Sequence, residues 1–261
     1  MLAIDRQRTI LELIEIGGSV RTVEMAGVLE VTEETIRRDF EKLEQEGHLT
    51  RAHGGAVKPE FGSSWQDIPF GERHKFQVAE KASMAQAALE EIKEGQVLFL
   101  DASSTVLHIA RNLPDLPLTV LTHALQVLWR LRDRTNLSVI STGGRLDLRS
   151  ASFLGPIADE AIANCHIDLF FFSCTGIDFD RGLSDPNDFQ AAFKRRVMQA
   201  ADRSVCLADH TKLGLRSAFF FAAPNEPDLV ITDGAADKNS IARLRSRGGQ
   251  LSVVGQDRNR S

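Results

Sequence analysis

Residues 22–57 read TVEMAGVLEVTEETIRRDFEKLEQEGHLTRAHGGAV, and this stretch decides the fold expected at the start of the chain. Its centre, residues 32–46, carries Ile36, Phe40 and Leu43 at positions i, i+4 and i+7. Side chains at that spacing lie on one face of an α-helix. The stretch therefore predicts an amphipathic helix with a polar outer face.

Capping signals support this helix. The hydroxyl of Thr32 can accept a hydrogen bond from a free backbone N–H, and Glu34 suits the positive first turn. Gly47 is a plausible helix stop. Residues 23–29 predict a shorter helix just before it, which leaves a tight turn between the two. Two helices joined in this way can place the second in a DNA major groove.

Residues 48–57 predict a small β wing, because two short extended pieces end at a Gly-Gly pair. Arg51 and His53 could lie along phosphates there, together with the amides of Gly54 and Gly55. The alternative is an ordinary three-helix module with a solvated charged face. If the stretch binds DNA, the expected contact residues are Thr22, Thr32, Glu34, Thr35, Arg37, Arg38, Lys42, Arg51, His53, Gly54 and Gly55.

Residues 35–56, TIRRDFEKLEQEGHLTRAHGGA, resemble the signature of the DeoR family of bacterial repressors. That signature reads T-[IV]-R-R-D-[LF]-x-x-L-E-x-x-G-x-[LI]-x-R-x-H-G-G-A, and nearly every defined position matches. The resemblance implies a winged helix-turn-helix that binds duplex DNA.

The charge balance does not by itself indicate a nucleic-acid-binding protein. The chain of 261 residues has a net charge of −5, and its first 58 residues hold eight Lys/Arg against eleven Asp/Glu. Five of those eight basic residues lie between Arg37 and Lys58, in the predicted recognition helix and wing. Because phosphate neutralisation drives non-specific binding, we expect modest non-specific affinity and a site-selective protein.

Cysteine usage and hydropathy indicate a cytoplasmic protein. The three cysteines, Cys165, Cys174 and Cys206, have neither CxxC nor metal-binding spacing, and an odd count without a signal peptide suggests reduced thiols. No apolar run reaches the roughly 20 residues that span a membrane. We expect no membrane contact, no metal and no cofactor.

The chain after residue 69 has a different pattern of apolar residues. Short apolar runs begin near residues 97, 118, 137, 169, 205, 229 and 251, and helix-like segments lie between most of them. That alternation predicts a Rossmann-like parallel sheet covered on both faces, and hence an α/β fold class. The expected organisation is a DNA-binding domain at 1–58, a linker at 59–69 and a ligand-binding, oligomerising domain at 70–261.

Three strand ends could bind an anion, because open α/β sheets bind ligands at the carboxyl ends of their strands. They are residues 101–105 (DASST), 141–145 (STGGR) and 208–212 (ADHTK). Each could instead be an ordinary cap or surface loop. No GxGxxG follows a strand and no GxxxxGK[ST] occurs, which disfavours dinucleotides and nucleoside triphosphates.

The DeoR resemblance extends over this half through markers that include Arg73, Lys81, DASST at 101–105, SFLGP at 152–156 and DHTK at 209–212. It implies a domain that resembles ribose-phosphate isomerases in fold and senses phosphorylated sugars. The effector residues it implies are Asp101, Ser103, Ser104, Thr105, His123, Gly143, Gly144, Gly176, Asp178, Lys194, Asp209 and Lys212. His123 stands where the family usually has Asn, which leaves it as either a ligand contact or a capping residue.

The functional expectation is a repressor of a carbohydrate-utilisation operon that a sugar phosphate releases from its operator. It would act as a homodimer or homotetramer. One alternative is a sugar-phosphate isomerase with a regulatory DNA-binding arm, since Asp101, Asp178, Asp185 and Asp209 offer carboxylates for a general base. Another is an activator, which differs only in where the operator lies.

Overall fold

The computed structural model describes residues 3–45, 49–52, 54–57 and 67–255, and the chain divides into two compact units, 1–62 and 63–261. We call these unit 1 and unit 2. Gly47, His53 and most of the expected linker lie outside the described residues.

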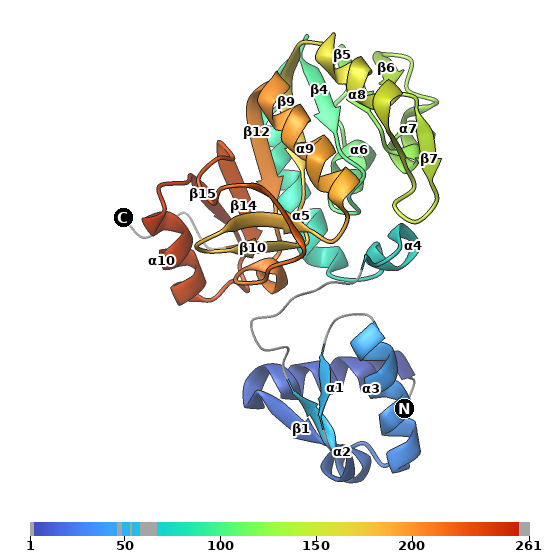
Figure 1. Ribbon diagram of the computed structural model, residues 1–261, viewed down its shortest axis with the longest axis vertical. Coiled ribbons are helices and arrows are strands. Elements are labelled where there is room, and N and C mark those ends of the chain that lie inside the picture. The colour runs from blue at the N-terminus through green and yellow to red at the C-terminus, as the bar shows by residue number, and fades with distance from the viewer. Residues whose placement is uncertain (1–2, 46–48, 53, 58–66, 256–261) are drawn as a thin grey trace. The chain divides into compact units, whose positions relative to one another are not determined.

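Unit 1 consists of three helices and a small antiparallel sheet (Figure 1). The helices are α1 (Ala3–Gly17), α2 (Thr22–Val28) and α3 (Glu33–Gln45). The strands β1 (Ser19–Arg21), β2 (Thr50–Ala52) and β3 (Gly55–Val57) pair in the order β1-β3-β2. The wing thus contains the two expected strands and a third, β1, that the sequence did not predict. Three residues are too few to show a strand period.

The core of unit 1 contains the predicted stripe of α3. Ile36, Phe40 and Leu43 are fully buried and pack in one cluster with Ile10 and other residues of α1. Ile4, another apolar residue of α1, is 73% exposed. It lies six residues before Ile10, and at 3.6 residues per turn that offset rotates its side chain about 120° away from the core.

Unit 2 is built on a seven-stranded sheet in the order β15-β14-β12-β9-β4-β5-β6, in which all neighbours are parallel. All seven apolar runs predicted from the sequence are strands of this sheet. They are β4 (Val97–Leu100), β5 (Leu118–Thr122), β6 (Leu137–Ser141), β9 (Ile167–Phe172), β12 (Ala201–Leu207), β14 (Leu229–Asp233) and β15 (Leu251–Val254).

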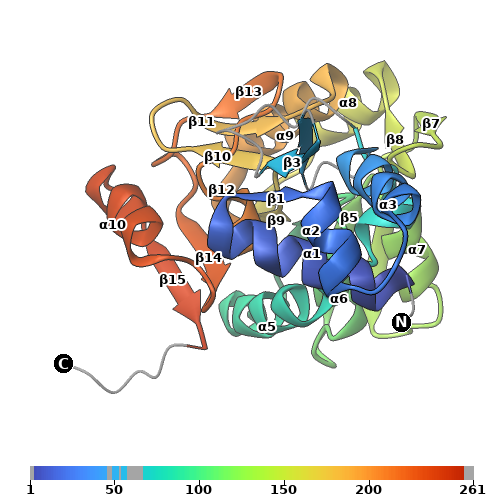
Figure 2. The same ribbon diagram turned by 90° about the horizontal axis from the view of Figure 1, so that it is seen from below.

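Helices cover both faces of the sheet (Figure 1; Figure 2). One face packs on α5 (Val78–Ala88), α6 (Val106–Arg111) and α7 (Leu125–Leu131), and the other on α8 (Pro156–Ala163), α9 (Asp188–Ala200) and α10 (Lys238–Ser246). Side chains alternate between these faces along each strand, so Leu98 and Leu100 join the first core while Phe99 joins the second. The short elements α4 (Phe70–Arg73), η1 (Leu89–Glu91) and η2 (His210–Lys212) complete the helical part.

Two small antiparallel sheets were not predicted. One pairs β7 (Arg145–Asp147) with β8 (Ser152–Leu154), and the other joins β10 (Gly176–Asp178), β11 (Gly182–Asp185) and β13 (Phe219–Ala222). Close backbone contact explains a glycine here. Gly182 has φ +102°, and a Cβ at this position would lie 2.0 Å from the carbonyl oxygen of Ala222.

Candidate DNA-binding and effector sites

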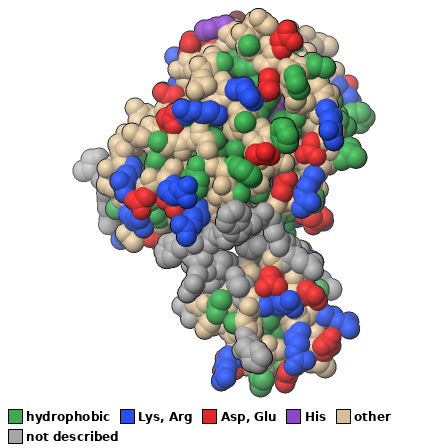
Figure 3. Space-filling model, in the orientation of Figure 1, with side chains coloured by type: hydrophobic (Ala, Val, Ile, Leu, Met, Phe, Trp, Pro, Cys, Tyr) green, Lys and Arg blue, Asp and Glu red, His purple; other side chains and the backbone are tan. Residues whose placement is uncertain are grey.

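The outer face of α3 presents the arginines expected to reach DNA. Arg38 is 77% exposed, and its Nε lies 3.4 Å from a carboxylate oxygen of Glu34. Arg37 donates to Glu33 at 2.8 Å and lies 3.7 Å from Glu34. Exposed ion pairs of this kind contribute little to stability, so a phosphate can replace the carboxylate at small cost. Basic and acidic side chains are accordingly mixed on the visible face of unit 1 (Figure 3).

The start of α3 has the predicted cap. Thr32 Oγ1 accepts the backbone N–H of Thr35 at 3.2 Å, and the two hydroxyl oxygens are 2.9 Å apart. Thr22, by contrast, is buried, and its backbone N–H donates to the carbonyl of Gly54 at 2.9 Å. The burial of Thr22 and its engaged amide do not favour a contact with DNA, which stays a prediction.

A buried ion pair joins the recognition helix to α1. Asp39 accepts hydrogen bonds from Arg6 Nε at 2.5 Å, from Arg6 Nη2 at 3.2 Å and from Gln7 Nε2 at 2.8 Å. Burial opposes the charged guanidinium, but the hydrogen bond from Arg6 to Asp39 is the larger effect and raises the pKa of Arg6. Asp39 thus fixes how α3 lies on α1, a role that sequence reasoning missed.

The wing has its own internal partners. Arg51 Nε lies 2.7 Å from a carboxylate oxygen of Glu44, and the backbone N–H of Arg51 donates to the same carboxylate at 2.8 Å. Gly55 lies in the central strand β3, where a Cβ would be 2.2 Å from the carbonyl oxygen of Val20. Packing alone therefore requires glycine at 55, while Gly54 is exposed at the turn with φ +81°.

In unit 2 two of the three predicted strand ends, 101–105 and 208–212, are joined through Ser173, which follows β9. Its backbone N–H donates to Asp101 Oδ2 at 3.1 Å, and its hydroxyl donates to the Leu207 carbonyl at 2.6 Å. The same hydroxyl accepts from Lys212 Nζ at 2.8 Å. Ser173 therefore links the loops after β4, β9 and β12. No motif in the sequence identified it.

Lys194 of α9 also reaches this point. Its ammonium donates to the Ser173 carbonyl and to Asp185 Oδ2, both at 2.6 Å, and lies 3.6 Å from Asp101 Oδ2. Burial opposes its charge, but Asp185 and Asp101 outweigh burial and raise the pKa of Lys194. Its charge is compensated by two carboxylates. These contacts favour a positioning role for Lys194, and its part in anion binding stays a prediction.

A second group of cations is not compensated in this way. Lys81 is buried, and its ammonium donates to the backbone carbonyls of Arg73 and Phe76 at 2.7 and 2.6 Å. Burial, and next the charge of Lys212, lower the pKa of Lys81 to about 8, and Arg73 contributes in the same direction. Lys212 has one carboxylate nearby, Asp209 at 3.8 Å. The arrangement concentrates positive charge at the carboxyl edge of the sheet.

Unpartnered polar atoms surround the same edge. Among the described residues, Arg73 Nε, Thr105 Oγ1 and both ring nitrogens of His123 are buried without a hydrogen-bond partner. Buried polar atoms normally have partners, so these are candidates for ligand contacts. His123 packs at a tilt against Phe193 with ring centroids 4.4 Å apart, and burial lowers its pKa to about 4, so its imidazole is neutral.

The loop after β4 is held from within. Asp101 Oδ1 accepts the N–H of Ser103 at 2.8 Å, and Ser103 Oγ accepts the N–H of Val106 at 3.1 Å. Ser104 Oγ donates to the Arg73 carbonyl at 3.3 Å. Ser103 and Ser104 therefore shape the loop that leads into α6, and Ser104 connects it to the segment that carries Arg73.

Several predicted effector residues have contacts that stabilise local structure, and their part in effector binding stays a prediction. Asp209 accepts the N–H of Thr211 at 3.2 Å and caps η2. Asp178 accepts the N–H groups of Asp180 and Arg181, both at 2.9 Å, in the turn after β10. A Cβ at Gly144 would lie 2.8 Å from the Leu154 carbonyl oxygen, and one at Gly176 would lie 2.6 Å from that of Leu215. Packing thus explains both glycines. Gly143 has φ +64°.

Comparison with known families agrees with this two-unit organisation. Residues 6–60 match the DeoR-like helix-turn-helix domain, and residues 76–234 match the DeoR C terminal sensor domain. The chain belongs to the DeoR family of transcriptional regulators. As a DeoR-type protein it is a DNA-binding regulator with a sensor domain, and the predicted family is confirmed.

Relatives of this DeoR-family protein cover nearly its whole length. The HTH-type transcriptional regulator YulB of Bacillus subtilis (strain 168), itself uncharacterized, is 39% identical over 97% of this chain and 98% of its own. The L-fucose operon activator of Escherichia coli (strain K12) is 36% identical over 87% and 94%. The HTH-type transcriptional repressor GlcR of Bacillus subtilis (strain 168) is 30% identical over 97% of each.

Among solved structures, ribose 5-phosphate isomerase A from Methanocaldococcus jannaschii overlaps 51% of this DeoR-family chain and 52% of its own, at a TM-score of 0.38 and 15% identity. A likeness at this level does not extend to activity. In the described part of the chain, every helix is too short or too polar to cross a bilayer.

Proposed function

We propose that this DeoR-family protein represses a carbohydrate-utilisation operon and leaves its operator when a phosphorylated sugar binds unit 2. The observation that carries the proposal is the concentration of cations and unpartnered polar atoms at the carboxyl edge of the sheet. One relative is named a repressor and another an activator. The sign of regulation depends on where the operator lies, and we take repression as the working case.

The anion end of the effector site would be formed by Arg73, Lys81 and Lys212 with the hydroxyl of Thr105. Lys81 and Lys212 repel each other, as the lowered pKa of Lys81 reflects. A phosphate dianion between them would remove that repulsion and give Arg73 Nε and Thr105 Oγ1 the partners they lack. The hydroxyl groups of an uncharged sugar would supply hydrogen-bond partners but would leave the repulsion between the two ammonium groups. The proposal therefore requires a phosphorylated effector.

The sugar end would lie toward His123 and Asp101. Both nitrogens of the neutral imidazole are free to pair with hydroxyl groups, one as donor and one as acceptor. Asp101 already accepts the N–H groups of Ser103 and Ser173, so it has fewer lone pairs to offer. The carboxylate of Asp178 already accepts two backbone N–H groups in a turn, so a sugar contact is less favoured there.

Release from DNA would follow from a difference in affinity between two states. Lys212 donates to Ser173, and an effector phosphate would draw that ammonium away. A ligand that binds one arrangement better shifts the population toward it. The two states would differ in the spacing of paired recognition helices in a homodimer or homotetramer. That spacing must match half-sites about one helical turn, or a multiple of it, apart.

The DNA contacts we propose are Thr35, Arg37, Arg38 and Lys42 from α3, with Arg51, His53 and the Gly54 amide from the wing. The arginines are exposed on one face of α3, as a helix in a major groove requires. Glu34 would orient Arg37 and Arg38, with which it forms ion pairs, rather than touch DNA itself. Thr32 would act through its cap.

The carboxylates that could serve as a general base are engaged by other groups, and this disfavours the isomerase alternative. A general base must be free to take a carbon-bound proton. Asp185 and Asp101 are both engaged by Lys194, and Asp209 by Thr211. The family membership also describes a regulator. We therefore propose that the protein binds sugar phosphates without turning them over.

The experiment measures thermal shifts, operator release and turnover of sugar phosphates, all on the full chain. Thermal shifts are recorded against pentose and hexose phosphates, their unphosphorylated parents and inorganic phosphate, because a ligand of the native state raises its stability with concentration. An operator is selected from a random duplex pool, and its release is followed by fluorescence anisotropy. A sugar phosphate that stabilises the chain, releases the operator and is not converted supports the proposal. Stabilisation by free sugars only, or turnover of any sugar phosphate, would overturn it.

A further inference from the structure

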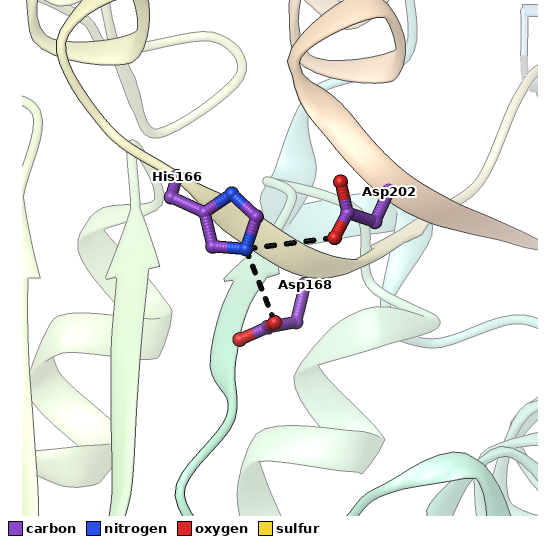
Figure 4. Close-up of side chains that lie close together, drawn as sticks. All are labelled: His166, Asp168 and Asp202. Carbon is purple, nitrogen blue, oxygen red and sulfur yellow. Dashed lines mark hydrogen bonds and ion pairs between the residues drawn. The ribbon is translucent and has the colours of Figure 1, made fainter.

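At the amino-terminal edge of the main sheet, an imidazole and two carboxylates converge from neighbouring strands. His166 precedes β9, Asp168 lies in β9 and Asp202 lies in β12. Their nearest ligand atoms all lie within 4.8 Å of one another, and Figure 4 shows the three side chains pointing toward one centre. The effector loops follow the carboxyl ends of the same strands, so this cluster lies outside that site.

The strand register produces this arrangement. Ala201 pairs with Ile167 and Arg203 with Leu169 in parallel strands, so Asp202 comes beside Asp168. His166 is two residues before Asp168 and therefore points to the same face of the sheet. Like charges beside each other on neighbouring strands are destabilising. Within the described chain no Lys or Arg side chain forms an ion pair with either carboxylate, so the imidazole is their common partner.

The distances fit a small divalent cation. His166 Nε2 lies 3.2 Å from Asp168 Oδ1 and 3.5 Å from Asp202 Oδ2. With metal–ligand bonds of about 2.0 to 2.1 Å, two ligands of a tetrahedral zinc ion are about 3.3 Å apart. The two separations from His166 Nε2 are already close to that value, and the two carboxylate oxygens lie within 4.8 Å of each other.

A backbone hydrogen bond also fixes the orientation of Asp168. The second oxygen of Asp168, Oδ2, accepts the backbone N–H of Val97 at 2.6 Å, which turns Oδ1 toward the imidazole. Hydrogen bonds of this kind fix the direction of metal-binding carboxylates. His166 and Asp202 are 64% and 66% exposed, which leaves the remaining coordination position open to water.

We propose that His166, Asp168 and Asp202 form a binding site for one zinc-like divalent ion. One imidazole with two carboxylates favours zinc, cobalt or nickel over magnesium, which prefers oxygen ligands alone. Asp168 and Asp202 both bind the ion, and its positive charge offsets the repulsion between the two carboxylates. It joins β9 to β12 at the edge opposite the effector loops, and so stabilises the sheet on which those loops are built.

The test uses the full chain after chelator treatment, with Zn²⁺ titrated by calorimetry and Co²⁺ by visible absorption. We expect one equivalent per chain, a thermal shift that grows with free Zn²⁺, and a Co²⁺ spectrum of low coordination number without thiolate bands. His166→Ala and Asp202→Asn each lower the affinity about tenfold or more. His74→Ala, which removes another exposed histidine, leaves it unchanged.

Asp202→Asn separates a metal site from a simple ion pair. It removes the like charge next to Asp168, so the metal-free variant is at least as stable as the wild type, while the Zn²⁺-induced shift is lost. Absence of saturable binding near one equivalent would overturn the proposal. So would thiolate bands that indicate cysteine ligands, or unchanged affinity in both variants.

Discussion

The buried pair between α1 and α3 gives the sharpest test of unit 1. Asp39→Ala removes three hydrogen bonds, two from Arg6 and one from Gln7, and leaves the guanidinium buried without its carboxylate. Breaking a buried ion pair by deleting one partner typically costs about 3 to 5 kcal/mol. We expect about 3 kcal/mol here, because Arg6 lies in a small unit where water can reach the stranded charge.

A loss of that size is large for such a unit. It raises the unfolding equilibrium constant more than a hundredfold, since about 1.4 kcal/mol corresponds to a factor of ten. Small domains have total stabilities of about 5 kcal/mol and upward. Residues of α3 should therefore open much more often, although most copies of unit 1 remain folded.

Native-state hydrogen exchange on the full chain measures this directly. The α3 amides report the opening free energy of unit 1, and the β4 and β9 amides of unit 2 serve as an internal reference that should not change. Glu41→Ala, an exposed acid on the same helix, is the matched control and should alter α3 protection by less than about 0.5 kcal/mol. The double variant Arg6→Met/Asp39→Leu should recover most of the loss. Exchange from α3 in Asp39→Ala that matches the wild type would refute the reasoning.

Three further outcomes are expected. Arg38→Ala should weaken operator binding and reduce its salt dependence. Thermal stability and sugar-phosphate affinity should not change, because the side chain is exposed. Equal loss of operator affinity in anisotropy and of sugar-phosphate affinity in thermal shifts would contradict the separation of roles. Lys212→Ala should keep operator affinity but require more effector for release in the same anisotropy assay, and normal release would show that the anion site is misassigned. His123 has its pKa lowered from 6.5 to about 4, so its contribution to stability is present above pH 6.5 and is lost as pH falls toward 4, by about 3 kcal/mol in all. His123→Asn should flatten that part of a melting-temperature profile between pH 7 and 4, and an unchanged slope would mean that other groups cause it.

Features that depend on local pattern were predictable from the sequence. The stripe Ile36, Phe40 and Leu43 is set by helical period alone, and it is buried as expected. The seven strands of the sheet were found because continuous apolar runs are typical of strands covered on both faces. The missed strands of the two small sheets have three or four residues each, and nothing in so short a segment separates a strand from a loop.

The sites were predicted less completely, because their contacts join distant parts of the chain. Ser173 is connected to residues 72 positions before it and 39 after it, and a lone serine after an apolar run carries no signal of this. Lys194 was predicted as an anion ligand, and its pairing with Asp185 could not be read from the sequence. Asp39 had no structural role assigned from the sequence, yet it is buried against α1.

The ion pairs along α3 have a consequence for how the protein searches a chromosome. Arg37 and Arg38 already hold carboxylates of Glu33 and Glu34, so contact with a phosphate must break an ion pair while it releases cations condensed on the DNA. The net gain that holds basic proteins to any duplex is correspondingly smaller. Such a protein spends little time on random sequence and travels by frequent dissociation rather than long sliding. Its residence at the operator then depends on base contacts, which keeps the bound state shallow enough for a small ligand to end it.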